Sequence, residues 1–212
     1  VIGGGVVGLF AASSTGEGPM LTDEDRLAVM RGTVEAAGGR AAVLCNVSDT
    51  STARVLAWAE RAKEAGADYV VATLPYYLRH DGAQIGDFYG RLAEESPLPV
   101  FVYNVPVYTK VQISAQVLGE LARHPNIVGV KDSTLDWRHF QQTIRVKEEH
   151  PDFAVLNGDE QALASTVFMG GDGGVLGLAN VAPRLCVDVF EAAERGDIEA
   201  ARRLQARLTD LQ

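Results

Sequence analysis

The sequence predicts an α/β protein that folds as a (β/α)8 TIM barrel, on three observations. Seven short apolar runs alternate with longer helix-like stretches at nearly regular spacing. The runs are apolar throughout, which is typical of parallel strands that are covered on both faces. Each run ends in polar residues, and a barrel gathers the carboxyl ends of all its strands at one mouth. A doubly wound open sheet is the alternative, but it uses mainly its switch point.

The strands are expected at the apolar runs 6–12, 41–45, 69–74, 99–102, 127–131, 153–156 and 174–179. The helices are expected at 22–37, 50–65, 83–95, 114–124, 137–149, 160–169, 184–195 and 197–211. Thr22 precedes three acidic residues and is a typical N-cap. Gly38, Gly66 and Pro125 stand just past helix ends, where glycine and proline stop a helix.

Seven strand–helix units are one short of a complete barrel. We therefore expect the first strand and helix to be missing from this chain, which starts at Val1 and not at a methionine. Residues 1–196 are expected to form the barrel without its first unit. Residues 197–212 are expected to begin a C-terminal helical extension.

The composition narrows the class of partner and the compartment. The net charge of −9 argues against nucleic acid or an anionic membrane surface as the main partner. No apolar run reaches the ~18 residues that a membrane helix needs. Cys45 and Cys186 lie in apolar stretches, which predicts reduced, buried thiols and a cytoplasmic location. The four histidines have no metal-ligand spacing, so no metal site is expected.

Two glycine-rich stretches resemble phosphate-binding loops. Residues 3–8 match G-x-G-x-x-G, but a dinucleotide fingerprint follows a strand and opens a helix, and this one precedes a strand. Residues 170–174 also lie on the entry side of a strand, and Asp172 would repel phosphate. Both stretches are interpreted as turns. A cofactor-binding oxidoreductase on an open sheet is kept as a weak alternative.

The run 127–134 places Lys131 at the end of a buried strand. Burying an ammonium is costly, so the position is unusual. One interpretation is a rim lysine that pairs with Asp132 or another carboxylate. The other is a lysine whose pKa is lowered by burial, so that its neutral amine attacks a carbonyl and forms a Schiff base.

On the barrel interpretation, the strand ends gather polar residues that suit this chemistry. They are Ser14, Thr15, Tyr76, Tyr77, Tyr103, Asn104 and Lys131. A neutral lysine condenses with a keto group, and the protonated imine acidifies the adjacent carbon. A tyrosine hydroxyl beside a cation can move the proton. The hydroxyls and N–H groups of the turn at 14–16 can hold a carboxylate. Taken singly, each residue could equally be an ordinary loop or rim residue.

Four motifs occur in order along the chain. They are Ser14-Thr15-Gly16-Glu17, Pro75-Tyr76-Tyr77, Tyr103-Asn104-Val105-Pro106 and Val130-Lys131-Asp132. In order and spacing, over nearly the whole chain, this set resembles the dihydrodipicolinate synthase / N-acetylneuraminate lyase family. The resemblance implies a homotetrameric (β/α)8 barrel that acts as a pyruvate-dependent aldolase without metal or cofactor. Its partners would be pyruvate and a small aldehyde or a 2-keto-3-deoxy acid.

The resemblance also implies a role for each matching residue. Lys131 would form the Schiff base and Tyr103 would transfer protons. Tyr77 would reach into the site of a neighbouring subunit. Ser14 would relay protons as well as bind substrate. The substrate-binding residues would be Ser14, Thr15 and Val175. Family chains also have a strand and helix before the position of Val1 and further helices after that of Gln212.

Two departures from the family pattern bear on the substrate. Ser14 stands where the family usually has threonine, and it keeps the hydroxyl. Tyr108 stands where dihydrodipicolinate synthases have an arginine that holds the carboxylate of aspartate semialdehyde, and tyrosine cannot form that bidentate pair. This favours a 2-keto-3-deoxy sugar acid aldolase. Lys110 offers a compensating cation, so dihydrodipicolinate synthase is the alternative. A barrel that binds a keto acid without turning it over is a further one.

Overall fold

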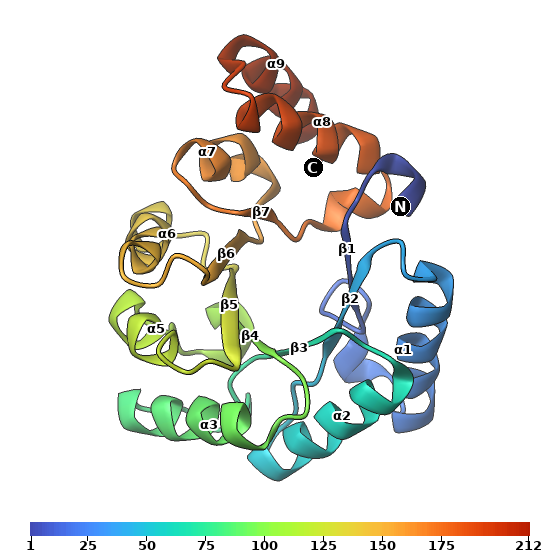
Figure 1. The fold of residues 1–212 in the computed structure, drawn as a ribbon, viewed down its shortest axis with the longest axis vertical. Coiled ribbons are helices and arrows are strands. Elements are labelled where there is room, and N and C mark those ends of the chain that lie inside the picture. The colour runs from blue at the N-terminus through green and yellow to red at the C-terminus, as the bar shows by residue number, and fades with distance from the viewer.

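The computed structural model describes residues 1–212 and contains one sheet of seven parallel strands in chain order. The strands are β1 (Gly8–Ala11), β2 (Ala42–Asn46), β3 (Tyr69–Ala72), β4 (Val100–Asn104), β5 (Ile127–Asp132), β6 (Ala154–Asn157) and β7 (Gly173–Gly174). The sheet curls into a half-barrel with its helices on the outside (Figure 1). The doubly wound alternative is wrong, because the strand order never reverses. The eighth strand stays a prediction.

The α-helices follow the strands around the outside of the sheet. They are α1 (Asp23–Ala37), α2 (Thr52–Ala65), α3 (Gly82–Glu95), α4 (Pro106–Thr109), α5 (Ala115–Leu121), α6 (Trp137–Ile144), α7 (Leu163–Phe168), α8 (Pro183–Glu194) and α9 (Ile198–Thr209). The caps predicted at Thr22, Gly38 and Gly66 are confirmed, whereas α5 ends at Leu121, four residues before the predicted stop at Pro125. The Thr22 side chain accepts from the Asp25 N–H, and Gly38 and Gly66 end α1 and α2 in the left-handed conformation.

The structure corrects the sequence analysis at several elements. The helices expected to reach residues 124 and 149 end at Leu121 and Ile144, and a 3-10 helix covers Arg145–Glu148. The strand expected at 174–179 is wrong, because β7 ends at Gly174 and a 3-10 helix covers Gly177–Asn180. The Glu160 carboxylate turns the chain there by accepting from the N–H groups of Gly177 and Leu178, at 2.6 and 3.2 Å. The short helix α4 was not expected. Pro106 begins it, as proline favours the first helical position.

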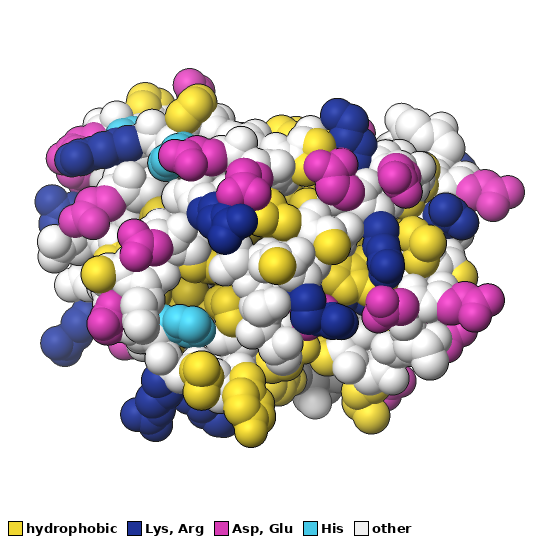
Figure 2. All heavy atoms as spheres, turned by 90° about the horizontal axis from the view of Figure 1, so that it is seen from below, with side chains coloured by type: hydrophobic (Ala, Val, Ile, Leu, Met, Phe, Trp, Pro, Cys, Tyr) yellow, Lys and Arg dark blue, Asp and Glu magenta, His cyan; other side chains and the backbone are white.

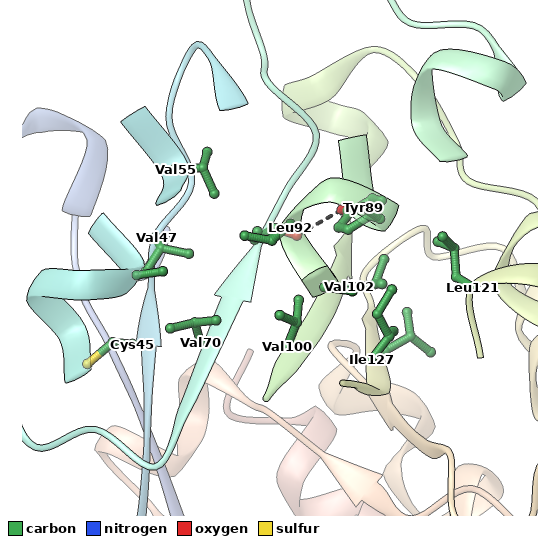
Figure 3. Packing of buried hydrophobic residues seen from close by; sticks show 14 of the residues in the cluster. Cys45, Val47, Val55, Val70, Tyr89, Leu92, Val100, Val102, Leu121 and Ile127 are labelled. Atoms are coloured by element: carbon green, nitrogen blue, oxygen red, sulfur yellow. Dashed lines mark hydrogen bonds between the residues drawn. The ribbon is translucent and has the colours of Figure 1, made fainter. Parts of the chain in front are cut away.

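Apolar side chains between the sheet and α1 to α6 form the main core. Figure 3 shows Val70, Val100 and Ile127 on the strands and Tyr89 on α3, and all four belong to this core. The Tyr89 hydroxyl donates to the Ala72 carbonyl at 2.8 Å, which satisfies the one polar atom of this side chain. This packing holds β3, β4 and β5 in place, and these strands lead to the polar ends where the candidate site lies.

A second, smaller core joins α7, α8 and α9, and it buries Cys186 beside Val189 and Leu208. Cys45 is buried in the main core, and both cysteines are free. The prediction of reduced, buried thiols is therefore confirmed. Burial raises the pKa of the Cys45 thiol to about 12, so that thiol is not a nucleophile at neutral pH.

The surface carries both signs of charge. Figure 2 shows basic and acidic side chains interspersed on one face, with apolar side chains between them. Arg184, for example, lies 2.6 Å from both Asp188 and Glu191. None of the helices combines the length and the apolar character that a membrane crossing requires.

Candidate active site

Lys131 and Tyr103 form a buried pair on neighbouring strands. They stand opposite each other in the register of β5 and β4. The Lys131 Nζ donates to the Tyr103 hydroxyl at 3.2 Å. The two residues are only 9% and 4% exposed. The geometry brings together the amine and the phenol that the sequence analysis singled out, at hydrogen-bond distance.

The interpretation of Lys131 as a rim lysine paired with Asp132 is wrong. Lys131 is buried and forms no ion pair, and Asp132 instead contacts His139 at 3.1 Å. Successive side chains on a strand point to opposite faces of the sheet. Lys131 therefore faces the inside of the curl, and Asp132 faces the helices.

Aromatic rings surround the amine. The Lys131 Nζ lies 4.3 Å from the ring centroid of Tyr103 and 5.2 Å from that of Phe10. The two rings meet edge to face, with centroids 5.9 Å apart. Phe10 comes from β1, so residues of three strands meet around one nitrogen. An amine in such a pocket is shielded from water but keeps a polar neighbour in the Tyr103 hydroxyl.

The Tyr103 hydroxyl is tuned by its surroundings. Burial raises its pKa, but the positive charge of Lys131 and the hydroxyls of Ser14 and Ser133 outweigh burial. The net effect is a pKa below the ordinary value of a tyrosine. A general acid/base works best when its pKa lies close to the working pH, so this shift suits Tyr103 to proton transfer.

A tight turn after β1 carries the hydroxyl pair. Ala12 and Glu17 adopt left-handed backbone angles, with φ of 51° and 52°. The Gly18 N–H closes the turn on the Ser13 carbonyl at 3.0 Å. A Cβ on Gly18 would lie 1.8 Å from the Ala12 carbonyl oxygen, so only glycine fits there. The turn places Ser14 against Tyr103, as the sequence analysis expects.

Thr15 lies further along the same turn, against the segment that follows β7. A Cβ on Gly177 would be 3.7 Å from the Thr15 hydroxyl oxygen, so the two residues are neighbours. Val175 is half-buried nearby, and its N–H donates to the Asn157 carbonyl at 2.8 Å. Thr15 and Val175, like Ser14, therefore lie at the carboxyl end of the sheet. Their contact with substrate stays a prediction.

The structure does not bring Tyr77 to the amine. Tyr77 is 83% exposed, in the segment between β3 and α3. Its expected role in a second subunit stays a prediction. Tyr108 is exposed on α4, and the Lys110 ammonium donates to the Val107 carbonyl at 2.7 Å. Lys110 therefore binds the backbone of its own turn.

The sequence analysis missed two residues of the site, Phe10 and Ser133. Strand alternation could have found both, because Ser133 is two residues past Lys131 and Phe10 lies on the strand that leads to Ser14. Their types gave no signal, since a phenylalanine in a strand is ordinary. No group of three or more histidine, cysteine, aspartate or glutamate side chains is arranged to hold a metal ion.

Comparisons with known proteins agree with this geometry. A profile of the Dihydrodipicolinate synthetase family matches residues 1–212. The 4-hydroxy-tetrahydrodipicolinate synthase of Methanospirillum hungatei is 34% identical over 211 residues, which are 100% of this chain and 72% of that protein.

Solved structures give the same result. Dihydrodipicolinate synthase from Bacteroides thetaiotaomicron is 38% identical with a TM-score of 0.94, over 98% of this chain and 70% of that one. YagE, a prophage protein of the dihydrodipicolinic acid synthase family from E. coli K12, was solved in complex with pyruvate. It is 32% identical with a TM-score of 0.95, over 99% of this chain and 71% of that one. With the sequence profile and the fold in agreement along its whole length, the chain belongs to the Dihydrodipicolinate synthetase family of pyruvate-dependent carbon–carbon lyases.

Proposed function

We propose that this chain is a class I aldolase whose Lys131 forms an imine with pyruvate or with a 2-keto-3-deoxy sugar acid. The observation that carries the proposal is the buried contact of 3.2 Å between the Lys131 Nζ and the Tyr103 hydroxyl. It supplies a nucleophile and a proton carrier at one point. The Ser14–Thr15 turn faces the same point and would hold the substrate carboxylate.

In the cleavage direction, the neutral Lys131 amine attacks C2 of the 2-keto acid. The Tyr103 hydroxyl, 3.2 Å from the amine, donates the proton with which the C2 oxygen leaves as water, so a protonated imine and a Tyr103 phenolate form together. Tyr103, as its phenolate, takes the proton from the C4 hydroxyl, and the C3–C4 bond breaks. The electron pair of that bond moves into the imine and forms an enamine, while C4 leaves as an aldehyde. Protonation at C3 and hydrolysis then release pyruvate and restore the lysine. Synthesis is the same path in reverse.

The choice of a sugar acid rests on the residues near α4. Tyr108 and Val107 offer no cation for a second carboxylate, and the Lys110 ammonium is engaged with a backbone carbonyl. Condensation of pyruvate with aspartate semialdehyde is the second candidate. It is favoured by the name of the relative from Methanospirillum hungatei, a 4-hydroxy-tetrahydrodipicolinate synthase.

We further propose that the enzyme works as a homotetramer and that Tyr77 completes the site of a neighbouring subunit. The exposed side chains of Tyr77, Leu78, Val107 and Tyr108 support a contact between subunits at this end of the sheet. The two free, buried cysteines support a cytoplasmic location.

Trapping the imine tests the proposed chemistry. Pyruvate and borohydride are added to the folded protein, and the lysine peptides are examined by mass spectrometry. We expect a reduced pyruvate adduct on Lys131, none in Lys131→Ala, and an unchanged adduct in the control Lys110→Ala. Absence of the adduct from folded wild-type protein rejects the proposal. Parallel assays with 2-keto-3-deoxygluconate, and with pyruvate plus aspartate semialdehyde, then separate the two candidate substrates.

A further inference from the structure

A buried polar network lies directly behind the Lys131–Tyr103 pair. Asp132 and Asn104 are the next residues along β5 and β4, and they also stand opposite each other in the sheet register. Their side chains point outward, toward α6, where His139 meets them. Asp132 is 2% exposed and His139 5%. The chemistry proposed above uses none of these three residues.

Asp132 is the centre of the network. Its Oδ2 accepts from the Asn104 Nδ2 at 3.0 Å and from the His139 Nε2 at 3.1 Å. Its Oδ1 accepts from the Thr134 N–H at 3.0 Å and from the Thr134 hydroxyl at 2.6 Å. No lysine or arginine pairs with it, so these four bonds fix the buried carboxylate. They tie together β4, β5, α6 and the turn between β5 and α6.

Asn104 extends the network to the segment that carries Tyr108. Its Nδ2 donates to the Ile113 carbonyl and its Oδ1 accepts from the Ile113 N–H, both at 3.0 Å. This two-sided clamp holds the far end of the segment that begins with α4. One cluster therefore restrains both the strand ends under the amine and phenol and the segment beside the mouth.

We propose that Asp132, His139 and Asn104 are positioning residues that keep the Lys131 amine and the Tyr103 hydroxyl at their working distance. The proposal rests on the proposed function, because it acts through imine chemistry at Lys131. The amine–phenol contact joins two strands, so its length changes when the strand ends shift against each other. Small misplacements of reacting groups are costly, and about 1 Å can reduce a rate by about 100-fold.

His139 offers the sharpest variants. In His139→Leu the donor to the Asp132 Oδ2 is lost, and a buried carboxylate oxygen keeps one partner where it had two. In His139→Gln the amide nitrogen can replace the Nε2 donor at a similar reach from the backbone. The glutamine variant therefore keeps a hydrogen-bond donor to the Asp132 Oδ2, and the leucine variant removes it.

The readout is exchange of the pyruvate methyl protons in D2O, followed by NMR. This exchange needs both the Lys131 imine and proton transfer by Tyr103, and it needs no aldehyde. We expect His139→Leu to lower kcat for exchange by about 10- to 100-fold, with the KM for pyruvate within about threefold of wild type. We expect His139→Gln to keep kcat within about threefold of wild type.

Equal kcat in wild type and His139→Leu overturns the inference. So does an equal loss in the leucine and glutamine variants that follows their loss of thermal stability, because a merely structural role predicts that result. If His139→Leu does not fold, Asp132→Asn replaces it and must show the same fall in kcat at constant KM. Wild-type protein without exchange and without a borohydride adduct rejects the proposed function itself, so the two failures are distinguishable.

Discussion

Replacing Tyr103 by phenylalanine removes one oxygen atom from the centre of the site and leaves the ring in place. The ring keeps its edge-to-face contact with Phe10, at 5.9 Å between centroids, and its place 4.3 Å from the Lys131 Nζ. The hydrogen bond of 3.2 Å to that nitrogen is lost. Because the buried ring of Tyr103 stays in place, the substitution tests the hydroxyl and not the packing.

The expected loss of rate follows from the role of the hydroxyl. A positioned general acid/base contributes about 10²- to 10⁴-fold, which corresponds to about 3 to 5 kcal/mol of barrier. A hydrogen bond to a charged group contributes about 1.5 to 3 kcal/mol to stability, and a domain has about 5 to 15 kcal/mol in all. We therefore expect Tyr103→Phe to stay folded while cleavage of a 2-keto-3-deoxy acid becomes slower by at least about 100-fold.

The assay couples pyruvate release to lactate dehydrogenase and follows NADH absorbance. Tyr69→Phe is the control, because Tyr69 is half-buried in the neighbouring strand β3 and its ring packs on Phe101 at 5.6 Å between centroids. The control is expected to keep its rate. The borohydride adduct on Lys131 is expected to persist in Tyr103→Phe, since the amine is intact. A cleavage rate within about threefold of wild type in a folded Tyr103→Phe variant would refute proton transfer by this hydroxyl.

Two further predictions concern the environment of the site. In Lys131→Met we expect the pKa of Tyr103 to rise above its wild-type value, because burial still raises this pKa and the positive charge that lowered it is gone. Ultraviolet difference titration, with Tyr103→Phe as the reference, measures the pKa of the Tyr103 hydroxyl. An unchanged titration midpoint would contradict the prediction. Gly18→Ala forces the turn open, because its Cβ would lie 1.8 Å from the Ala12 carbonyl oxygen, and pyruvate binding by calorimetry is expected to be lost. Gly32→Ala, in open space on α1, is the control, and it is expected to raise the free energy of unfolding by about 0.5 to 1 kcal/mol in denaturant titration.

Much of the architecture could be predicted, because the hydrophobic pattern and the residues that cap or end helices determine where the strands and helices lie. The parallel strands and the long helices appear where apolar runs alternate with capped, amphipathic stretches, as the Thr22 cap of α1 shows. The run 174–179 fails for a physical reason. Leu176 is buried in the small core beside α7 and α8, and Leu178 and Ala179 pack against that core. The Glu160 carboxylate turns the backbone of the run away from the sheet. An apolar run alone does not show whether its residues form a strand of the sheet or pack in a separate core.

The site also contains residues that could be predicted from the sequence and others that could not. Lys131 and Tyr103 could be predicted as partners because both end strands that meet at one edge of the sheet. The outward direction of the Asp132 side chain was missed, because the interpretation of Lys131 as a rim lysine considered the charge of Asp132 and not the alternation of side chains along the strand. The exposure of Tyr77 is not shown by any hydrophobic pattern within the chain. Only the family resemblance implied it, through an expected reach into a neighbouring subunit, and that role stays a prediction.

Strand parity explains how so few residues would both perform and support the proposed chemistry. At the ends of β4 and β5, one residue of each adjacent pair faces inward and the next faces outward. The inward residues, Tyr103 and Lys131, make the buried contact at which the chemistry is proposed to occur. The outward residues, Asn104 and Asp132, bind each other at 3.0 Å and connect the strands to α6 and to Ile113. A shift of either strand would disturb both contacts together, so the outward bond maintains the register on which the inward bond depends.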